Sequence, residues 1–372
     1  MVEIGEGAVP HLINLLGGDI PVARKRDDQV AISHFVAEAL VGIAVKSGKK
    51  EIVGALRQIA SGGQGGSPGK RAGAIIALGK LPPDWRSPED IAAIESGLSG
   101  SVPEMIVAAA NSLAAERSVS SLQRLSDALA SAPDDNVKTV IVLAVIDLDQ
   151  KGNNAPVSSL VSAFSGAKST ILMEYSLAAL GIAEDVEAIP TLIKARISPY
   201  PAVVAATSKA VVRLPKEKAV ALLRDELKNK DYRIRQSATL LLGDIGEASV
   251  AKALLDLLVD PNPPRVKRDP ETSVRVAAAA AIGKIKPKMK NIVEGLINAL
   301  KDPDDDVRQN AYTALKATTG METIEFDPVG KDAQRKEAIK KWELWFKVNG
   351  DKVFEEKKEE DKKEEAPANG GT

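Results

Sequence analysis

Residues 293–320 read VEGLINALKDPDDDVRQNAYTALKATTG, and this stretch decides the fold. Its apolar residues follow helical spacing on both sides of an acidic segment, which predicts two short helices joined by a tight turn. Residues 302–306 supply carboxylates that can cap the second helix, and Asp231 is expected to do the same in its own unit. Most of the remaining chain consists of looser copies, and a unit repeated every 31 to 40 residues is the signature of a stacked solenoid.

One apolar residue near the end of each second helix tracks the repeat. Nine such positions define nine units: Leu40, Leu78, Leu113, Ile146, Leu180, Val211, Leu242, Ile282 and Leu315. Each unit pairs a first helix that carries an apolar stripe with a second helix that is rich in alanine. Small alanine side chains allow neighbouring helix pairs to approach closely. The predicted fold is therefore all-α, a solenoid of about nine helix pairs.

The composition agrees with a core built from aliphatic residues. The chain has 372 residues, of which 44% are hydrophobic and 27% are charged, so it can bury a large core. Aromatic residues make up only 3% of the chain. This scarcity favours closely packed helices over a β-sandwich or barrel, whose strands use aromatic and β-branched residues more heavily.

Charge and cysteine content weaken or exclude several function classes. The formal net charge is −1, and the tail at 351–366 carries −3, which leaves +2 for the rest of the chain. A nearly neutral body lacks the concentrated basic face that neutralises phosphates, so nucleic acid is not the expected partner. The absence of cysteine excludes disulfides, thiolate catalysis and cysteine zinc sites. No run of about 18 apolar residues exists, so no membrane span is predicted.

The chain is expected to contain three segments. They are a repeat array at 1–320, a capping segment at 321–350 and a disordered charged tail at 351–372. A helix at 332–348 carries Trp342 and Trp345 on an apolar stripe. The expected use of this stripe is to cover the exposed core of the last repeat.

Two insertions between first and second helices carry concentrated charge. Residues 18–28 and 261–272 lengthen their units and should emerge from the same edge of the stack. This loop edge presents six basic residues: Arg24, Lys25, Arg26, Arg265, Lys267 and Arg268. Each cluster is followed at once by aspartate, so solvated turns are the preferred interpretation and a binding edge is the alternative.

Three units carry the residues of a known repeat family. The matching positions are Asp305, Asp306, Val307, Arg308, Ala311, Ala314 and Leu315; Tyr232, Arg233, Ile234, Arg235, Ala238, Leu241, Leu242 and Gly243; and Ser273, Val274, Arg275, Ala278, Ala281, Ile282 and Gly283. On these residues the chain resembles HEAT-repeat proteins of the armadillo-like α-solenoid group. The resemblance covers about residues 8–320, and units four to six keep the periodicity but lose the arginine. The closing segment, with Phe326, Asp327 and Pro328, resembles the ending of some bacterial HEAT arrays.

The resemblance implies a curved, right-handed superhelix that binds other macromolecules and seldom catalyses a reaction. It places the binding site on the concave surface, which the second helices line. Four polar residues are predicted to face into that groove: Asn111, Lys209, Gln236 and Asn310. Solvated helix faces have the same sequence pattern, so this assignment is a prediction for the structure to place.

No catalytic residue, metal or cofactor is predicted. The sequence GGSPG at 65–69 matches the G-x-S-x-G pattern of a nucleophile elbow, but a helix rather than a strand precedes it. Pro68 also has no N–H to donate to an oxyanion, so a flexible loop is the better interpretation. The only histidines are His11 and His34, which cannot assemble the His-Glu iron pairs of HEAT-type deoxyhypusine hydroxylases and are not expected to form a zinc site.

Arg235, Arg275 and Arg308 recur at the same place in three second helices. One interpretation is a positive ladder along the groove. The other is that each arginine pairs with aspartates of its own or the neighbouring turn. The second interpretation is preferred, because such arginines belong to the packing pattern of the family that the chain resembles.

The function predicted from the sequence is a monomeric, non-enzymatic scaffold that binds a protein or peptide along its groove and loop edge. Two alternatives stay open: nucleic-acid binding, as in HEAT-like DNA glycosylases, and a bilin lyase-like role, since related repeats occur in phycobilin lyases. The first residues resemble the end of one repeat running into the next, so the chain is expected to begin inside an array. A soluble cytoplasmic protein is the default expectation, with an upstream export signal left open.

Overall fold

The computed structural model of the chain describes residues 5–17, 26–63, 66–116, 119–149, 156–260 and 268–364. Within these residues the chain is all-α, with nineteen α-helices and no strand. The helices are α1 (Val9–Leu15), α2 (Arg26–Ser47), α3 (Lys50–Ala60), α4 (Pro68–Gly79), α5 (Pro88–Glu95), α6 (Pro103–Glu116), α7 (Leu122–Ser131), α8 (Asp135–Leu148), α9 (Val157–Gly166), α10 (Thr170–Ile182), α11 (Ile189–Arg196), α12 (Pro201–Val211), α13 (Lys216–Glu226), α14 (Tyr232–Ile245), α15 (Ala251–Leu258), α16 (Thr272–Ile285), α17 (Lys290–Ala299), α18 (Asp305–Thr319) and α19 (Asp332–Glu364). Every one of these helices is too short or too polar to be a membrane span.

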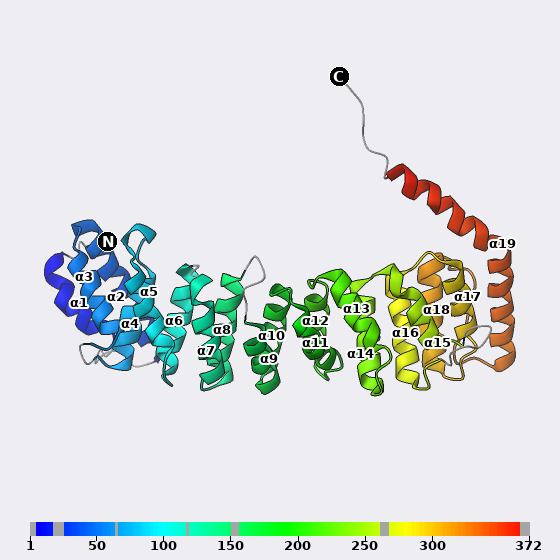
Figure 1. The fold of residues 1–372 in the computed structure, drawn as a ribbon, viewed down its shortest axis with the longest axis horizontal. Coiled ribbons are helices and arrows are strands. Elements are labelled where there is room, and N and C mark those ends of the chain that lie inside the picture. The colour runs from blue at the N-terminus through cyan, green and yellow to red at the C-terminus, as the bar shows by residue number, and fades with distance from the viewer. Residues whose placement is uncertain are drawn as a thin grey trace, which may run out of the picture. The chain divides into compact units, whose positions relative to one another are not determined.

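Consecutive helices alternate as first and second helices of nine successive pairs, from α1 and α2 to α17 and α18, and α19 follows them (Figure 1). The two helices of each pair pack on each other except in the sixth, where α11 packs on α13 and α14 instead. Each of the nine apolar residues that track the repeat lies on the second helix of its pair, as predicted. Eight of them are buried. Ile146 is only half-buried, and its neighbour Val145 is fully buried and marks the repeat better in α8.

The helix pairs belong to two compact units. Unit 1 comprises residues 1–188 and 200–213, and unit 2 comprises residues 189–199 and 214–372. The sixth pair is divided by this boundary, because α11 belongs to unit 2 and α12 belongs to unit 1.

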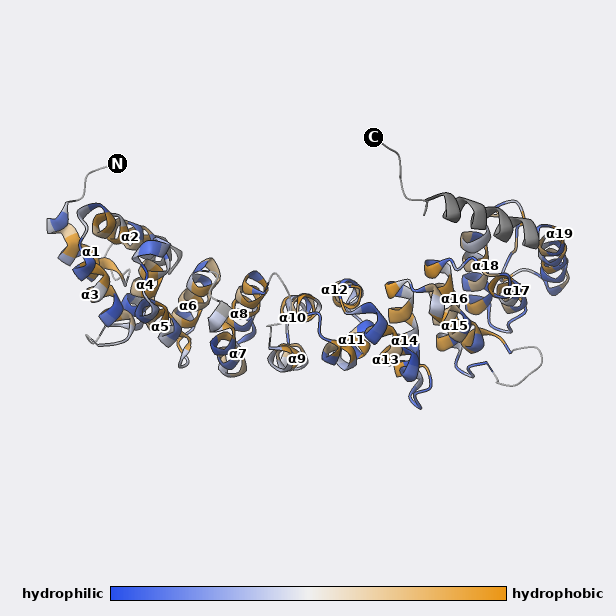
Figure 2. Cartoon of the chain, turned by 45° about the horizontal axis from the view of Figure 1, so that its top comes forward, coloured by the Kyte–Doolittle hydropathy of each residue, from blue (hydrophilic) through white to orange (hydrophobic). Residues whose placement is uncertain are grey.

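Within each unit, second helices pack against second helices. In unit 1, α4 contacts α6, α6 contacts α8, α8 contacts α10, and α10 contacts α12; in unit 2, α14 contacts α16, which contacts α18. First helices form the other layer, through α3 with α5 and α7 with α9 in unit 1 and α15 with α17 in unit 2. Figure 2 shows hydrophilic and hydrophobic residues mixed along the helices of both units, as expected for helices with one buried side. This two-layer stacking is the arrangement of an α-solenoid.

Glycine facing alanine sets the distance between the second helices of unit 2. A Cβ atom added to Gly243 of α14 would lie 2.8 Å from the Cα atom of Ala281 in α16. A Cβ atom added to Gly283 of α16 would lie 3.1 Å from the Cα atom of Ala314 in α18. Such distances leave little or no room for a methyl group in a close-packed interior. The close stacking expected from the alanine content is therefore present, and glycine is the residue that permits it.

Carboxylates begin two second helices at the places that the sequence predicts. Asp231 precedes α14 and accepts a hydrogen bond from the backbone N–H of Arg233 at 2.9 Å. Asp304 precedes α18 and accepts hydrogen bonds from the backbone N–H groups of Asp306 and Val307 at 3.0 and 3.3 Å. Both aspartates thus satisfy backbone donors that have no partner inside the helix.

Helix α19 covers the core of the last helix pair of unit 2. Trp342 is fully buried, and the centre of its ring lies 6.5 Å from that of Tyr312 in α18 and 5.6 Å from that of Trp345. Tyr312 also contacts Phe326, at 5.7 Å between ring centres. The helix continues to Glu364, into the segment that the sequence analysis assigned to a tail, and residues 365–372 lie outside the described part of the chain.

Candidate functional site

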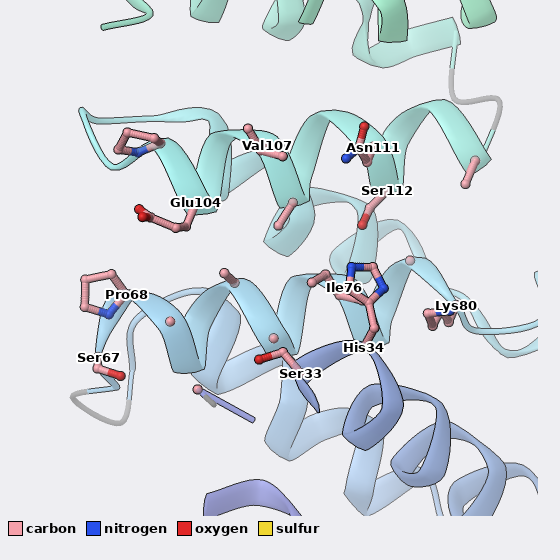
Figure 3. A pocket seen from close by; sticks show the side chains of 18 residues that line it. Ser33, His34, Ser67, Pro68, Ile76, Lys80, Glu104, Val107, Asn111 and Ser112 are labelled. Carbon is pink, nitrogen blue, oxygen red and sulfur yellow. The ribbon is translucent and has the colours of Figure 1, made fainter. Parts of the chain in front are cut away.

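A groove of about 730 Å³ lies in unit 1, along three successive second helices (Figure 3). Helix α2 contributes Ser33 and His34 to its lining, α4 contributes residues between Ser67 and Lys80, and α6 contributes residues between Pro103 and Ala115. A volume of several hundred Å³ is typical of binding clefts. The groove therefore has the size of a binding site and lies on the helix layer that the sequence analysis selected.

The groove exists because its central helix presents small residues to it. Gly69, Ala72, Gly73, Ile76 and Gly79 follow each other at helical spacing along α4, and all of them line the groove. Only one of these five residues has a side chain larger than a methyl group. A helix side without long side chains leaves a trough between the helices on either side of it, here α2 and α6.

Two glycines of this floor are also fixed by packing. A Cβ atom added to Gly73 would lie 2.2 Å from the carbonyl oxygen of Leu16, next to the end of α1. One added to Gly79 would lie 2.5 Å from the Oγ atom of Ser112 in α6. Any larger residue at either position would push a neighbouring backbone or helix away. The same residues that form the floor thus hold the groove helices together.

Polar groups stand at the two ends of the groove. Figure 3 shows Ser67 and Glu104 toward one end and His34 and Lys80 toward the other. The Nζ atom of Lys80 lies 2.7 Å from the Oε1 atom of Glu38, so α2 and α4 are joined by an ion pair at this rim. The hydrogen bond from Lys80 holds the pKa of the Glu38 carboxyl below its usual value. The Glu38 carboxyl therefore stays ionised at neutral pH.

Ser67 has a structural partner rather than a catalytic one. It precedes α4, and its hydroxyl oxygen accepts a hydrogen bond from the backbone N–H of Lys70 at 3.3 Å. Helix α3 comes before it in the chain, so the strand that a nucleophile elbow requires is missing here. The stretch 65–69 is also not the loop that was predicted, because Ser67 caps α4 and Pro68 and Gly69 belong to its first turn, while Gly65 lies outside the described residues. Within the described residues, no three His, Asp or Glu side chains gather as metal ligands.

The four polar residues predicted to line one groove belong to two units. Asn111 lines the groove of unit 1 and is exposed. Lys209 is exposed on α12 of the same unit but does not line this groove. Gln236 and Asn310 belong to unit 2 and are half-buried, and the Asn310 amide donates a hydrogen bond to the backbone oxygen of Asp306 at 2.9 Å.

Most of the predicted loop edge cannot be placed. Arg24, Lys25, Arg265 and Lys267 lie outside the described residues, and Arg26 is the first residue of α2. Arg268 is described, and its Nη1 atom donates to the Oδ2 atom of Asp302 at 2.7 Å. This basic residue of the edge is thus engaged within the protein.

Two of the three recurrent arginines pair with aspartates, as the preferred interpretation predicts. Arg235 of α14 donates from Nε and Nη2 to both carboxylate oxygens of Asp269, at 2.5 and 2.9 Å. These hydrogen bonds raise the pKa of Arg235 above its ordinary value. Arg275 of α16 likewise donates from Nε and Nη2 to the two carboxylate oxygens of Asp302, at 3.0 and 3.2 Å. Each aspartate belongs to the next helix pair, so the arginines join successive repeats.

Of the residues that line the groove, sequence reasoning selected only Asn111, and the polar residues that it missed include His34, Lys80 and Glu104. Nothing in their local sequence distinguishes them from other surface residues. The signal that could have found the groove is the spacing of small residues in SPGKRAGAIIALGK, residues 67–80. One side of that helix lacks long side chains. A second helix with such a side predicts a groove above it.

Comparison with protein families gives one match. A model described as HEAT repeats matches residues 189–269 and 264–326. These residues include the three second helices that carry the recurrent arginines. No curated protein sequence matches the chain significantly.

Solved structures with a similar fold are distant in sequence. Kap121p bound to Ste12p is 12% identical, with a TM-score of 0.52 over 83% of this chain and 37% of Kap121p, so the chain spans less than half of that protein. Human deoxyhypusine hydroxylase is 15% identical, with a TM-score of 0.30 over 75% of this chain and 99% of that one. The CpcE and CpcF complex of phycocyanin lyase from Nostoc is 23% identical, with a TM-score of 0.31 over 43% of this chain and 99% of that one. Likeness at these identities concerns the fold alone.

Proposed function

We propose that this chain, which is a HEAT-repeat protein, acts as a non-enzymatic scaffold and binds a segment of a partner protein in the groove along α2, α4 and α6. The observation that carries the proposal is the trough over α4, which has a floor of small residues and polar groups at its ends. No cofactor is required for binding of this kind. We propose further that the scaffold is monomeric.

The width of the trough suits one peptide segment. Packed helices lie about 8–10 Å apart, so α2 and α6, on either side of α4, are separated by roughly 16–20 Å. The side chains of α2 and α6 themselves take up about 10–12 Å of this axis-to-axis distance, so the space between the two rims suits one extended segment. Peptide recognition commonly places an amphipathic segment in a groove of this kind.

The chemistry of the lining describes the segment that fits. Ile76 of α4 and Val107 of α6 are half-buried and offer apolar contacts along the middle of the groove. Glu104 is exposed near one end. Asn111 is exposed on α6 and can both donate and accept hydrogen bonds. The expected ligand is an amphipathic segment with its apolar residues inward.

Nucleic acid is a poorer partner for the described surface. Outside its acidic tail the chain carries a net charge of only +2. Arg235 and Arg275, which would be needed for a positive ladder, are bound to aspartates. Among proteins with the same fold, Kap121p binds another protein, Ste12p, and this supports a partner of the same class.

Site-specific crosslinking tests the groove directly. A photoreactive amino acid is placed at Asn111, inside the groove, and in a second variant at Lys209, which is exposed on a second helix of the same unit outside the groove. We expect one protein to be captured from Asn111 and not from Lys209. Its affinity is then measured with Asn111→Trp, which fills the groove, and with Lys209→Trp as the matched control.

Asn111→Trp should weaken binding of that protein by about tenfold or more, which corresponds to the loss of about 1.4 kcal/mol. Lys209→Trp should leave the affinity unchanged. Equal capture from both positions, or an affinity that Asn111→Trp does not alter, contradicts the proposal.

A further inference from the structure

Unit 2 contains three Asp-Pro turns of the same geometry, at residues 269–271, 302–304 and 327–329. In each turn the aspartate carboxylate accepts a hydrogen bond from the backbone N–H two residues later, at 3.0, 3.0 and 3.1 Å. The first two turns precede α16 and α18, and the third lies between α18 and α19. The local fold therefore offers three equivalent positions for an arginine from the preceding helix pair.

The first two positions are filled by ion pairs. Arg235 binds the Asp269 carboxylate through Nε and Nη2, and Arg275 binds that of Asp302 through the same two atoms. Both arginines use Nη1 for two backbone carbonyl oxygens of the turn before their own helix. All donor atoms of these guanidinium groups thus have acceptors.

The third position is incomplete. Arg308 donates from Nη1 to the carbonyl oxygens of Asp302 and Pro303, both at 2.8 Å, but its Nε atom donates to the carbonyl oxygen of Pro328 at 2.7 Å. The Asp327 carboxylate lies against Gly330 instead, since a Cβ atom added there would be 2.8 Å from its Oδ2 atom. Among the described residues, Arg308 has no carboxylate partner and its Nη2 atom has no hydrogen-bond acceptor, although the residue is only 7% exposed.

Arg308 lines a cavity of about 460 Å³ between the last helix pair and α19. The ionisable residues of this lining are Lys301, Asp302, Arg308, Asp332, Arg335, Lys336, Lys340 and Glu343. They comprise five cations and three acids, which is a surplus of two positive charges.

The three acids of the cavity are already engaged. The Asp302 carboxylate is bound by Arg275 and Arg268. Asp332 is shared by two cations of the lining, at 2.7 Å from Lys336 and 3.4 Å from Arg335. Glu343 pairs with Lys301 at 2.9 Å. Lys340 is exposed and has no ion-pair partner among the described residues, so it adds its charge to that of Arg308.

A buried guanidinium without a counter-ion is unfavourable, because its desolvation is not offset by a nearby opposite charge. Three carbonyl dipoles offset part of this cost for Arg308, whereas its two counterparts have full carboxylates as well. An anion in the cavity would pair with Arg308 as the aspartate of the next repeat pairs with Arg235 and Arg275. Arginine is well suited to bind the oxygens of carboxylate or phosphate groups.

We propose that this cavity is an oxyanion-binding site, in which Arg308 and Lys340 bind a phosphate or carboxylate group of a small ligand. The surplus of two positive charges favours a doubly charged group, so phosphate should bind more tightly than a monocarboxylate. The site belongs to unit 2 alone and is independent of the groove in unit 1.

Calorimetric titration of the full chain at low ionic strength tests the site, with inorganic phosphate in one arm and acetate in the other. We expect saturable binding of phosphate and weaker binding of acetate. Lys340→Gln removes an exposed charge of the lining and should weaken phosphate binding by about threefold to tenfold without unfolding the protein. Lys341→Gln is the matched control, since the next residue of the same helix is exposed and does not line the cavity.

Arg308→Lys keeps the positive charge and removes the planar guanidinium, so it should weaken binding at least as much, with circular dichroism to confirm folding. Heats that do not saturate with either anion would overturn the site. The same conclusion follows if Lys340→Gln leaves phosphate affinity unchanged, or if Lys341→Gln lowers it equally, because nonspecific attraction to the helix would then explain the binding. Tighter binding of acetate than of phosphate would overturn the assignment to a doubly charged group.

Discussion

The second helices of both units approach their neighbours at glycine residues, and those of unit 2 are joined in addition by buried ion pairs. Arg235 and Arg275 of unit 2 each reach the aspartate of the next repeat. In unit 1, α4 meets its neighbours through Gly73 and Gly79, which approach a carbonyl oxygen and a serine hydroxyl. Ion pairs and glycine contacts both hold helix pairs together, but the surfaces that remain exposed beside them differ.

This difference distinguishes side chains that are used for packing from surfaces that are open to a ligand. Arg235, which donates to a carboxylate and two carbonyl oxygens, uses four of its five N–H hydrogens within the protein, so this family-like repeat of unit 2 leaves little for a partner. A helix side made of glycine and alanine leaves space above it, so the less family-like repeats of unit 1 contain the groove. Sequence regularity therefore indicates packing in this protein, and departures from it indicate where a ligand can bind.

Removing the shared aspartate of the ion-pair network should have the largest effect on stability. Asp302→Ala takes away the acceptor of both Arg275 and Arg268, and Arg275 is only 5% exposed. A buried charge left without its partner destabilises a protein by about 3–5 kcal/mol. Urea unfolding followed by circular dichroism should show a loss of this size.

The control for that experiment is an exposed ion pair of the same unit. Arg233 pairs with Asp231 at 2.9 Å, and its side chain is 62% exposed. Arg233→Ala should leave the unfolding midpoint unchanged, because solvent screens such pairs. If both variants shift the midpoint equally, burial of the network is not what stabilises unit 2.

A smaller effect is expected at the glycine contacts between second helices. Gly243→Ala places a methyl group 2.8 Å from the Cα and Cβ atoms of Ala281, so α14 and α16 must separate, at a cost of about 1–3 kcal/mol. Gly54 of α3 is the matched control, since a Cβ atom there meets nothing within 4 Å. Gly54→Ala should stabilise the protein by about 0.5–1 kcal/mol through its helix propensity. If Gly243→Ala is neutral or stabilising like Gly54→Ala, the helices are not held at contact distance by glycine.

Much of the fold could be predicted because the repeat has a strong period. Leu315 and its equivalents identify the second helices, and the acidic turn before α18 identifies where that helix begins. The register was off by one residue in α8, where the apolar run at 140–146 gives no polar residue to mark the buried side. Ile146 is half-buried there and Val145 is buried.

The candidate site could be predicted only in part. Asn111 was placed on the correct helix layer, because second helices of such repeats share one side of the stack. His34, Lys80 and Glu104 could not be found, since their positions around one groove depend on how three helices far apart in sequence lie beside one another. The groove itself results from side chains that are absent, and the alanine and glycine of 67–80 were interpreted only as stacking material.

Amide hydrogen exchange of the chain with and without the partner captured at Asn111 tests the central claim most directly. The account predicts slower exchange in α2, α4 and α6 on binding and unchanged exchange in α14, α16 and α18. Protection confined to the second helices of unit 2 would contradict it, because the ion-paired repeats rather than the groove would then bind the partner.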